Sequence, residues 1–287
     1  MYIPRQSKTG LCHWQRLLYI DMHQYWYARI KQLHYFWGLL IGVGLVLAHL
    51  AMTLPQLSAH LDGNQYLFTP YTQWISFNTD PWTIALFLSL PLLSTLSAAQ
   101  IIGEDARSGF IAHIVQYRRL KHYLLTNLGV SFIGGALTII VPLLIDFIGM
   151  WCFLPHIKPD QILNANMSLL PDTTYFASLY YTHPLALVGF YVLLAGAVAG
   201  MFGLLGAVVS LFVDNRFIGL GFGFTLTMML NVLSNALPHM AFSPVLLCIG
   251  CSPAYIPTFS ATIAGFVVAI GGLSMLGSIA GRRRVYV

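Results

Sequence analysis

The stretch that decides the fold is EDARSGFIAHIVQYRRLK, Glu104 to Lys121, which separates two long apolar runs. It begins with two acidic residues and ends with basic ones. Apolar residues at the spacing of one helix face lie between these ends, which predicts a basic amphipathic helix. These residues are Phe110, Ile111, Ile114 and Val115.

The sequence on both sides of this stretch is too apolar for a water-soluble protein. Of the 287 residues, 57% are hydrophobic and 8% are charged, whereas soluble domains carry about 25% charged residues. A helix of about 20 apolar residues crosses a bilayer core. The sequence therefore predicts an all-α polytopic membrane protein with a single domain over residues 1–287. The six expected spans are about 33–54, 82–103, 123–154, 185–213, 217–239 and 259–281.

The distribution of lysine and arginine predicts the orientation of these spans. Of the 14 such residues, 13 lie before the first span, within 104–121, at Arg216 or at 282–284, and Lys158 is the exception. The positive-inside rule then places both termini and the 104–121 segment in the cytoplasm. Membrane topology thus accounts for the net charge of +5, which does not indicate nucleic acid as a partner.

Two further segments are predicted beside the spans. Residues 11–31 have the pattern of an interfacial helix in the plane of the lipid headgroups, and a cytoplasmic helix packed on the protein itself is the alternative. Residues 240–258 are apolar but contain three prolines, which favours a broken re-entrant element before the sixth span. This segment holds Cys248 and Cys251, which could form a disulfide or stay free, and no further ligand is spaced for a zinc site.

Small residues form two stripes at helical spacing. Gly196, Gly200 and Gly203 lie in the fourth span, and Gly265 and Gly272 lie in the sixth. Such faces let helix backbones approach closely. Packing within one bundle is the favoured interpretation, and a contact between subunits is the alternative.

Polar side chains inside the expected spans are few. Ser94, Ser97 and Gln100 could line a polar pathway, or they could bond back to their own helix. Asp146 is the only acidic candidate within a span, and we expect it at the outer border, in an interfacial role rather than in proton transfer. His49 is expected to be a packing histidine whose hydrogen bonds are satisfied.

The chain lacks the motifs of common enzymes. None of its four lysines follows a glycine, so the phosphate loop G-x-x-x-x-G-K-[ST] is absent. H-E-x-x-H and G-x-S-x-G are absent too, and Glu104 is the only glutamate. We therefore expect no catalytic residue, cofactor or metal in this chain. If ATP drives its activity, a separate subunit must hydrolyse the ATP.

The segment from Glu104 to Lys121, followed by Tyr123, resembles the connection between the second and third spans of ABC-2 type transporter permeases. These are the membrane subunits of many bacterial exporters. The shared features are an acidic start, a small residue before Gly109, an amphipathic turn, basic residues and a tyrosine that opens the next span. The order of amphipathic helix, six spans and broken element is similar too. One departure is that Thr126 and Asn127 stand where a lysine usually follows the tyrosine.

The resemblance implies a multi-pass permease in the bacterial plasma membrane. Its partners would be two cytoplasmic ATPase subunits, which hold the ATP and Mg²⁺, a second permease copy or a sister permease, and membrane lipids. The helix within 104–121 would be the coupling helix. We expect its apolar face to point toward the ATPase, and the opposite assignment, against the chain's own spans, stays open. The residues expected in coupling are Glu104, Asp105, Arg107, Gly109, Phe110, Ile111, Ile114, Val115 and Arg118.

The resemblance also suggests a substrate class. Small permeases rich in aromatic residues often resemble those of bacteriocin export or immunity systems, and this chain has 15 tyrosines and 18 phenylalanines. An amphipathic or antimicrobial peptide is therefore the expected substrate, with lipids, drugs and polysaccharide precursors as alternatives. A membrane scaffold or sensor that transports nothing is a competing hypothesis, and a membrane-embedded enzyme is a third.

Overall fold

The computed structural model describes residues 33–61, 67–97, 99–111, 120–162, 164, 169–236 and 243–286. These residues form helices, turns and loops, without a strand. Six helical segments among them are long and apolar enough to cross a membrane. The prediction of an all-α protein with six such helices is confirmed, whereas the helix expected at 11–31 lies outside the described residues.

The helices begin and end within a few residues of the expected spans. Proline begins α5 and α10, because a proline in the first turn lacks only an N–H that the helix does not use. The second span is divided into α5 and α6. The bounds are α3 Trp37–Leu57, α5 Pro81–Thr95, α6 Ala99–Arg107, α8 Leu120–Phe153, α10 Pro184–Phe212, α11 Arg216–Ala236 and α12 Phe259–Tyr286.

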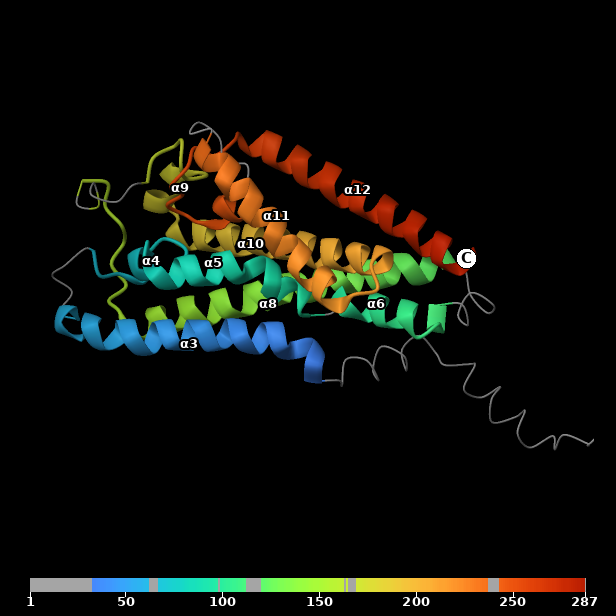
Figure 1. The fold of residues 1–287 in the computed structure, drawn as a ribbon. Helices are drawn as coiled ribbons and strands as arrows, with labels where there is room; N and C mark the ends of the chain where they lie inside the picture. The colour runs from blue at the N-terminus through green and yellow to red at the C-terminus, as the bar shows by residue number, and fades with distance from the viewer. Residues whose placement is uncertain are drawn as a thin grey trace, which may run out of the picture.

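Two long helices, α8 and α10, form the centre of the bundle. They pack against each other along their length (Figure 1), and α10 is the most buried of the six membrane-crossing helices. With 34 and 29 residues they are about 51 and 44 Å long, longer than the roughly 30 Å of a hydrocarbon core. Helix α3 lies along α8, whereas α12 is mostly exposed.

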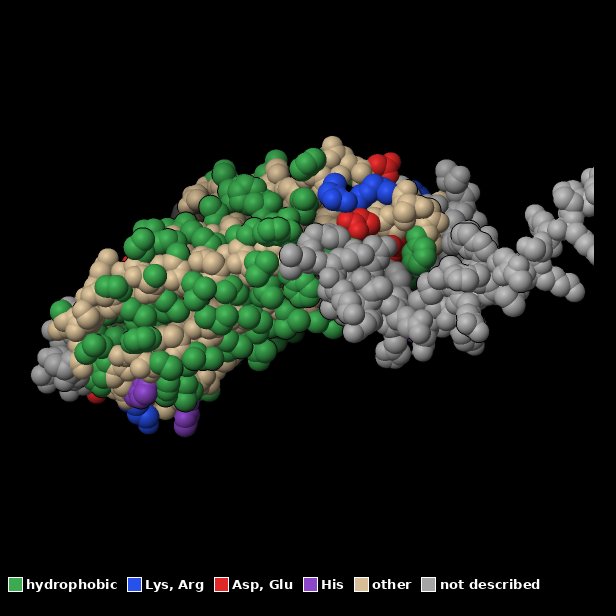
Figure 2. Space-filling view, turned by 90° about the horizontal axis from the view of Figure 1, so that it is seen from below, with side chains coloured by type: hydrophobic (Ala, Val, Ile, Leu, Met, Phe, Trp, Pro, Cys, Tyr) green, Lys and Arg blue, Asp and Glu red, His purple; other side chains and the backbone are tan. Residues whose placement is uncertain are grey.

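Charge distinguishes the two ends of the bundle. The basic end carries Arg107, Lys121, Arg216, Arg282 and Arg283, and the start of α3 and the C-terminus lie there too (Figure 1). We call the other end the loop end. Lys158 is the only Lys or Arg that the described residues contribute to it. Figure 2 shows one face of the molecule, with hydrophobic side chains along the middle and charged ones near the ends.

Three segments pack together at the loop end. Residues 67–78 include helix α4 (Pro70–Gln73), residues 169–183 include α9 (Ala177–Thr182), and residues 243–258 include the 3-10 helix η3 (Pro244–Cys248). The third segment is joined to the other two by hydrogen bonds, for example from Gly250 N to Ser76 O at 2.8 Å. Beyond η3 the third segment has no regular helix before α12. It therefore has the irregular backbone expected of 240–258, of which 240–242 lie outside the described residues.

Candidate functional site

Helix α6 carries the acidic start of the 104–121 segment into the basic end. It packs against α8 and α10, and Ile101 and Ile102 are buried in this contact. Gly103 allows the close approach to α10, since a Cβ at this position would lie 2.7 Å from Cβ of Ser210. The packing fixes the last turn of α6, and with it the two acidic residues that follow Gly103.

Asp105 is bonded inside the chain. Its side chain is fully buried, and its Oδ2 accepts a hydrogen bond from the hydroxyl of Tyr123 at 2.5 Å. Tyr123 is buried in the first turn of α8. The sequence predicted that Asp105 takes part in coupling, and this stays a prediction. In this structure the carboxylate of Asp105 joins α6 to α8 and has no exposed surface to offer a partner.

Glu104 connects three elements. Its Oε1 lies 3.1 Å from Nη2 of Arg216, the first residue of α11. Its Oε2 accepts a hydrogen bond of 2.6 Å from the hydroxyl of Tyr35, which lies in the 3-10 helix η1 (Leu33–Phe36) before α3. We call Tyr35, Glu104, Asp105, Tyr123 and Arg216 the anchor cluster. Glu104 was predicted as a functional residue because it begins the 104–121 segment. Neither Tyr35 nor Arg216 was predicted as its partner.

The residues after Glu104 and Asp105 turn the chain away from α6. Arg107 donates from Nη1 to the carbonyl oxygen of Asp214 at 3.5 Å. Gly109 has a φ of +72°, a left-handed conformation that glycine adopts readily and that commonly ends a helix. The glycine of the predicted motif therefore has a conformational role, and the turn that it forms is exposed.

The apolar residues of the segment are partly described. Ile111 is buried in the same cluster as Ile102 and Tyr123, and Phe110 packs against this cluster while half-buried. Ile111 thus packs against the chain's own spans, which is the alternative that the sequence left open. Ile114, Val115 and Arg118 lie outside the described residues.

The polar residues of the second span bond to their own chain. Ser94 Oγ donates to Leu90 O and Ser97 Oγ donates to Ser94 O, both at 2.7 Å. Gln100 Nε2 donates to Thr95 O at 3.3 Å. All three side chains are buried, at the place where α5 ends and α6 begins. Of the two interpretations, the structure shows the one in which they bond back to the helix.

The structure joins His49 and Asp146, which the sequence treated separately. His49 Nδ1 lies 2.7 Å from Asp146 Oδ1, and both side chains are 0% exposed. The second carboxylate oxygen of Asp146 accepts the backbone N–H of Ile75 at 2.9 Å, and the indole of Trp74 donates to Leu143 O at 3.1 Å. Asp146 is therefore enclosed by protein near the loop end of α8, where it holds residues 67–78, rather than open to the membrane border.

The two glycine stripes differ in what they contact. A Cβ at Gly196, Gly200 or Gly203 would come within 3 Å of α8 atoms, so this stripe lies in the centre of the bundle. A Cβ at Gly265 or Gly272 would meet nothing within 4 Å. Helix α12 approaches its neighbours at Gly277 and Gly281 instead, so Gly265 and Gly272 make no close helix contact within the described part of the chain.

The three described cysteines are free thiols in this structure. Cys248, the last residue of η3, and Cys251 are buried, and Cys152 is exposed. Burial raises the pKa of the Cys251 thiol to about 11 and that of Cys248 further above its usual value. Where the chain is described, it gathers no three His, Cys, Asp or Glu side chains that could hold a metal ion.

Comparison with known proteins finds no match: no family model, no curated protein and no solved structure is significantly similar to the chain. Among the described residues, six helices are long and apolar enough to cross a membrane, which is the character of a multi-pass membrane protein. The resemblance of residues 104–123 to ABC-2 permeases stays a prediction.

Proposed function

We propose that this chain is the permease subunit of an ATP-driven exporter in the bacterial plasma membrane. The observation that carries the proposal is the anchor cluster, which ties the start of the 104–121 segment to three other elements. Hydrogen bonds and an ion pair join Glu104 and Asp105 to Tyr35, Tyr123 and Arg216. An ATPase that moves this segment would therefore move the entries to α3, α8 and α11 with it.

Such coupling requires a connection that transmits a displacement. A loop attached only at its two ends would bend and absorb the movement, whereas elements that are packed and hydrogen-bonded to one another shift as rigid bodies. Asp105 is fully buried, and α6 packs on the two central helices. The anchor cluster thus has the rigidity that a lever arm needs.

We divide the segment into an internal and an external part. Asp105 and Ile111 are buried and hold the segment to the spans. Ser108 and Gly109 are exposed at the turn and are assigned to the ATPase, together with Ile114, Val115 and Arg118. The basic end faces the cytoplasm in this proposal, as the excess of lysine and arginine there favours.

The remaining parts follow the family resemblance. Two ATPase subunits hold ATP and Mg²⁺, and a second permease, identical or a sister protein, completes the pathway. Residues 11–31 lie in the headgroup plane, and 240–258 form a re-entrant element at the outer side. The substrate is an amphipathic or antimicrobial peptide, in keeping with the many aromatic residues.

The proposal is tested in liposomes that contain the full chain and the ATPase subunit that co-purifies with it from membranes. Flux of a labelled amphipathic peptide is measured with and without ATP, together with the ATPase rate. Glu104→Gln and Asp105→Asn should leave the purified complex intact and reduce ATP-dependent flux by about tenfold or more, a loss of at least 1.4 kcal/mol in coupling. Asp160→Asn, an exposed acid at the loop end, is the matched control and should keep its flux.

A charge exchange examines the ion pair itself. Glu104→Arg and Arg216→Glu should each uncouple hydrolysis from flux, and the double variant should recover part of the coupling. Recovery should be incomplete because the exchange removes the acceptor of the Tyr35 hydroxyl. Unchanged flux in every variant would contradict the coupling role, and absence of ATP-dependent flux in the unmodified protein would favour a scaffold or sensor.

A further inference from the structure

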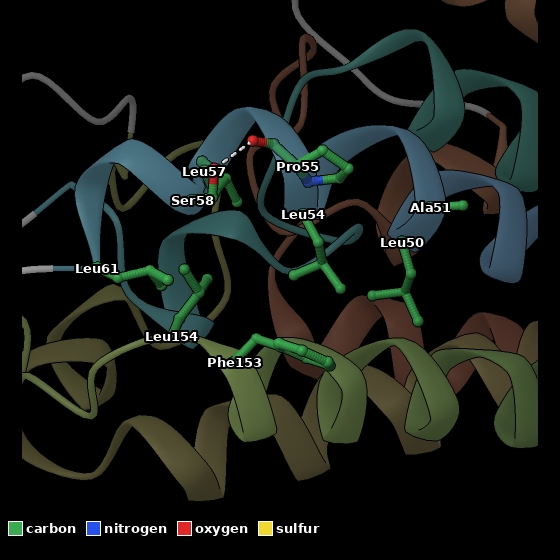
Figure 3. Close-up of a pocket in the computed structure, with 9 residues that line it drawn as sticks. All are labelled: Leu50, Ala51, Leu54, Pro55, Leu57, Ser58, Leu61, Phe153 and Leu154. Carbon is green, nitrogen blue, oxygen red and sulfur yellow. Dashed lines mark hydrogen bonds between the residues drawn. The ribbon is translucent and has the colours of Figure 1, made fainter.

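A hollow between the loop ends of α3 and α8 is lined by hydrocarbon (Figure 3). Its volume is about 410 Å³, within the range of roughly 300–1,000 Å³ found for ligand pockets. Most of its wall comes from α3 and the turn after it, and the end of α8 closes the other side. The principal lining residues are Leu50, Leu54, Leu57, Leu61, Phe153 and Leu154.

The local sequence explains why a hollow forms here. Leu50 touches α8 closely, since a Cβ at Gly149 would lie 2.6 Å from Leu50 Cδ1. Five residues later Pro55 lies inside α3, where it has no N–H to bond the carbonyl of Ala51. The hollow lies beyond the close contact at Gly149, and Pro55 is part of its lining.

The chemistry of the hollow selects an apolar occupant. Of the nine described residues that line the hollow, only Ser58 has a polar side chain, and its hydroxyl already donates to Pro55 O at 2.6 Å (Figure 3). A ligand that needed hydrogen bonds would lose them on entering. A hydrocarbon chain loses no hydrogen bond there, and because it comes from the bilayer its gain is packing contact, about 0.1–0.2 kcal/mol for each well-spaced pair of carbon atoms.

The position of the hollow indicates where such a chain comes from. Helix α3 has 21 residues and is about 31 Å long, which matches a hydrocarbon core of roughly 30 Å. The hollow occupies its last two turns, beside the border of the hydrocarbon. Phe153 of α8, on the rim of the hollow, is 62% exposed, and Met52 of α3 is 60% exposed, so the surrounding surface faces lipid.

A cation follows the hollow in the sequence. Lys158 is exposed and lies four residues after Leu154, a reach of at most about 14 Å. Among the described residues it is the only Lys or Arg at this end, and His156 beside it is exposed too. Asp160 is the acid nearest to Lys158 in the sequence, and its Oδ1 accepts the N–H of Ile162 at 2.8 Å.

We infer that this hollow binds one acyl chain of an anionic membrane phospholipid whose phosphate lies against Lys158. The acyl chain enters between Leu54 and Phe153, and the headgroup stays at the loop end. A lysine near the membrane surface favours an anionic lipid. The inference does not depend on transport, and its failure would leave the proposed function untouched.

Photocrosslinking of the purified full-length chain tests the inference. Phosphatidylglycerol with a diazirine in one acyl chain is compared with phosphatidylcholine that carries the same chain, and crosslinked peptides are mapped by mass spectrometry. Phosphatidylglycerol should label residues 50–61 and 153–154 in preference to other lipid-facing helices, about fivefold more strongly than phosphatidylcholine does. Labelling spread evenly over all exposed helices would show an ordinary shell of lipid and overturn the inference.

Three variants separate the acyl chain from the headgroup. Ala51→Phe fills the hollow and should lower its labelling about tenfold, whereas the matched control Ala264→Phe, on the exposed face of α12, should not. Lys158→Gln alters only an exposed side chain, and it should abolish the preference for phosphatidylglycerol while the hollow is still labelled. An unchanged preference in this variant, or capture of a second copy of the chain by p-benzoylphenylalanine at position 153, would overturn the inference.

Discussion

At the scale of single residues, the pair of His49 and Asp146 is the main polar contact inside the apolar bundle. Both side chains are fully buried, and the carboxylate receives two N–H donors, from the His49 ring and from Ile75. Nε2 of His49 has no hydrogen-bond partner among the described residues. The histidine expected to have satisfied hydrogen bonds is therefore paired at Nδ1 and not at Nε2 within the described part of the chain.

Removal of one partner should destabilise the bundle. A buried pair that loses one member leaves an uncompensated polar group, at a cost of about 3–5 kcal/mol. We expect Asp146→Leu and His49→Leu to lower the midpoint of thermal unfolding in detergent, measured by tryptophan fluorescence. Asp160→Asn, at an exposed site, should stay within about 0.5 kcal/mol of the unmodified protein. Equal midpoints for all variants would mean that the pair does not hold residues 67–78.

The cysteines should differ in reactivity. Burial raises the pKa of Cys251 from 9.0 to about 11, so almost no thiolate is present at pH 8 in the folded protein. N-ethylmaleimide should modify Cys152 quickly at pH 8 and modify Cys248 and Cys251 only after unfolding, as read by peptide mass spectrometry.

The same shift has a consequence for stability. The raised pKa of Cys251 means that the folded state favours the neutral thiol. Below a pH of about 9 the thiol is neutral in both the folded and the unfolded state, so it does not affect the free energy of unfolding. The folded state loses stability as the pH rises from about 9 toward 11.

In the maleimide experiment at pH 8, modification of Cys251 as fast as that of Cys152 would contradict its burial and show that the loop end opens.

At the scale of elements, glycine determines how closely α8 and α10 approach. A Cβ at Gly203 would lie 2.5 Å from the backbone oxygen of Ser131, and a backbone atom cannot move aside as a flexible side chain does. Gly203→Ala should therefore separate the helices and cost about 1–3 kcal/mol in thermal unfolding.

The matched control is Gly265→Ala, where nothing lies within 4 Å of the added methyl group. Alanine favours the helix over glycine by about 1 kcal/mol, so this variant should be neutral or slightly stabilising. Destabilisation at Gly265 comparable to that at Gly203 would indicate that α12 packs against another helix after all.

The positions of the spans could be predicted because they depend on local properties. Twenty apolar residues in a row identify a span wherever it packs. The partners of Glu104 could not be predicted in the same way, since Tyr35 and Arg216 are 69 and 112 residues away. It could not be predicted either that Gly265 stands apart from the bundle while Gly203 packs in its centre, because both stripes repeat at a helical spacing.

At the scale of the whole molecule, the surface separates into an apolar middle and two polar ends. Large hydrophobic side chains are exposed on the membrane-crossing helices, among them Leu193 at 69% and Val268 at 74%. Soluble monomers rarely expose apolar patches beyond a few hundred Å². This distribution fits a chain whose middle is covered by lipid, and it leaves the orientation of the two ends as the property on which the proposed function depends.

The orientation predicted from the lysines and arginines of the chain is directly measurable. In a background whose four cysteines are replaced, Lys158→Cys and Ser108→Cys put one exposed thiol at the loop end and one at the basic end. A membrane-impermeant maleimide should label Lys158→Cys in intact cells and Ser108→Cys only after permeabilisation, because the five described arginines and lysines of the basic end favour the cytoplasmic side. Asp160→Cys, two residues from Lys158, should behave like Lys158→Cys, which shows that the result reports the side of the membrane and not one residue. The reverse pattern would place the 104–121 segment outside the cell, where ATPase subunits cannot reach it, and would contradict the exporter proposal while leaving the six-helix fold intact.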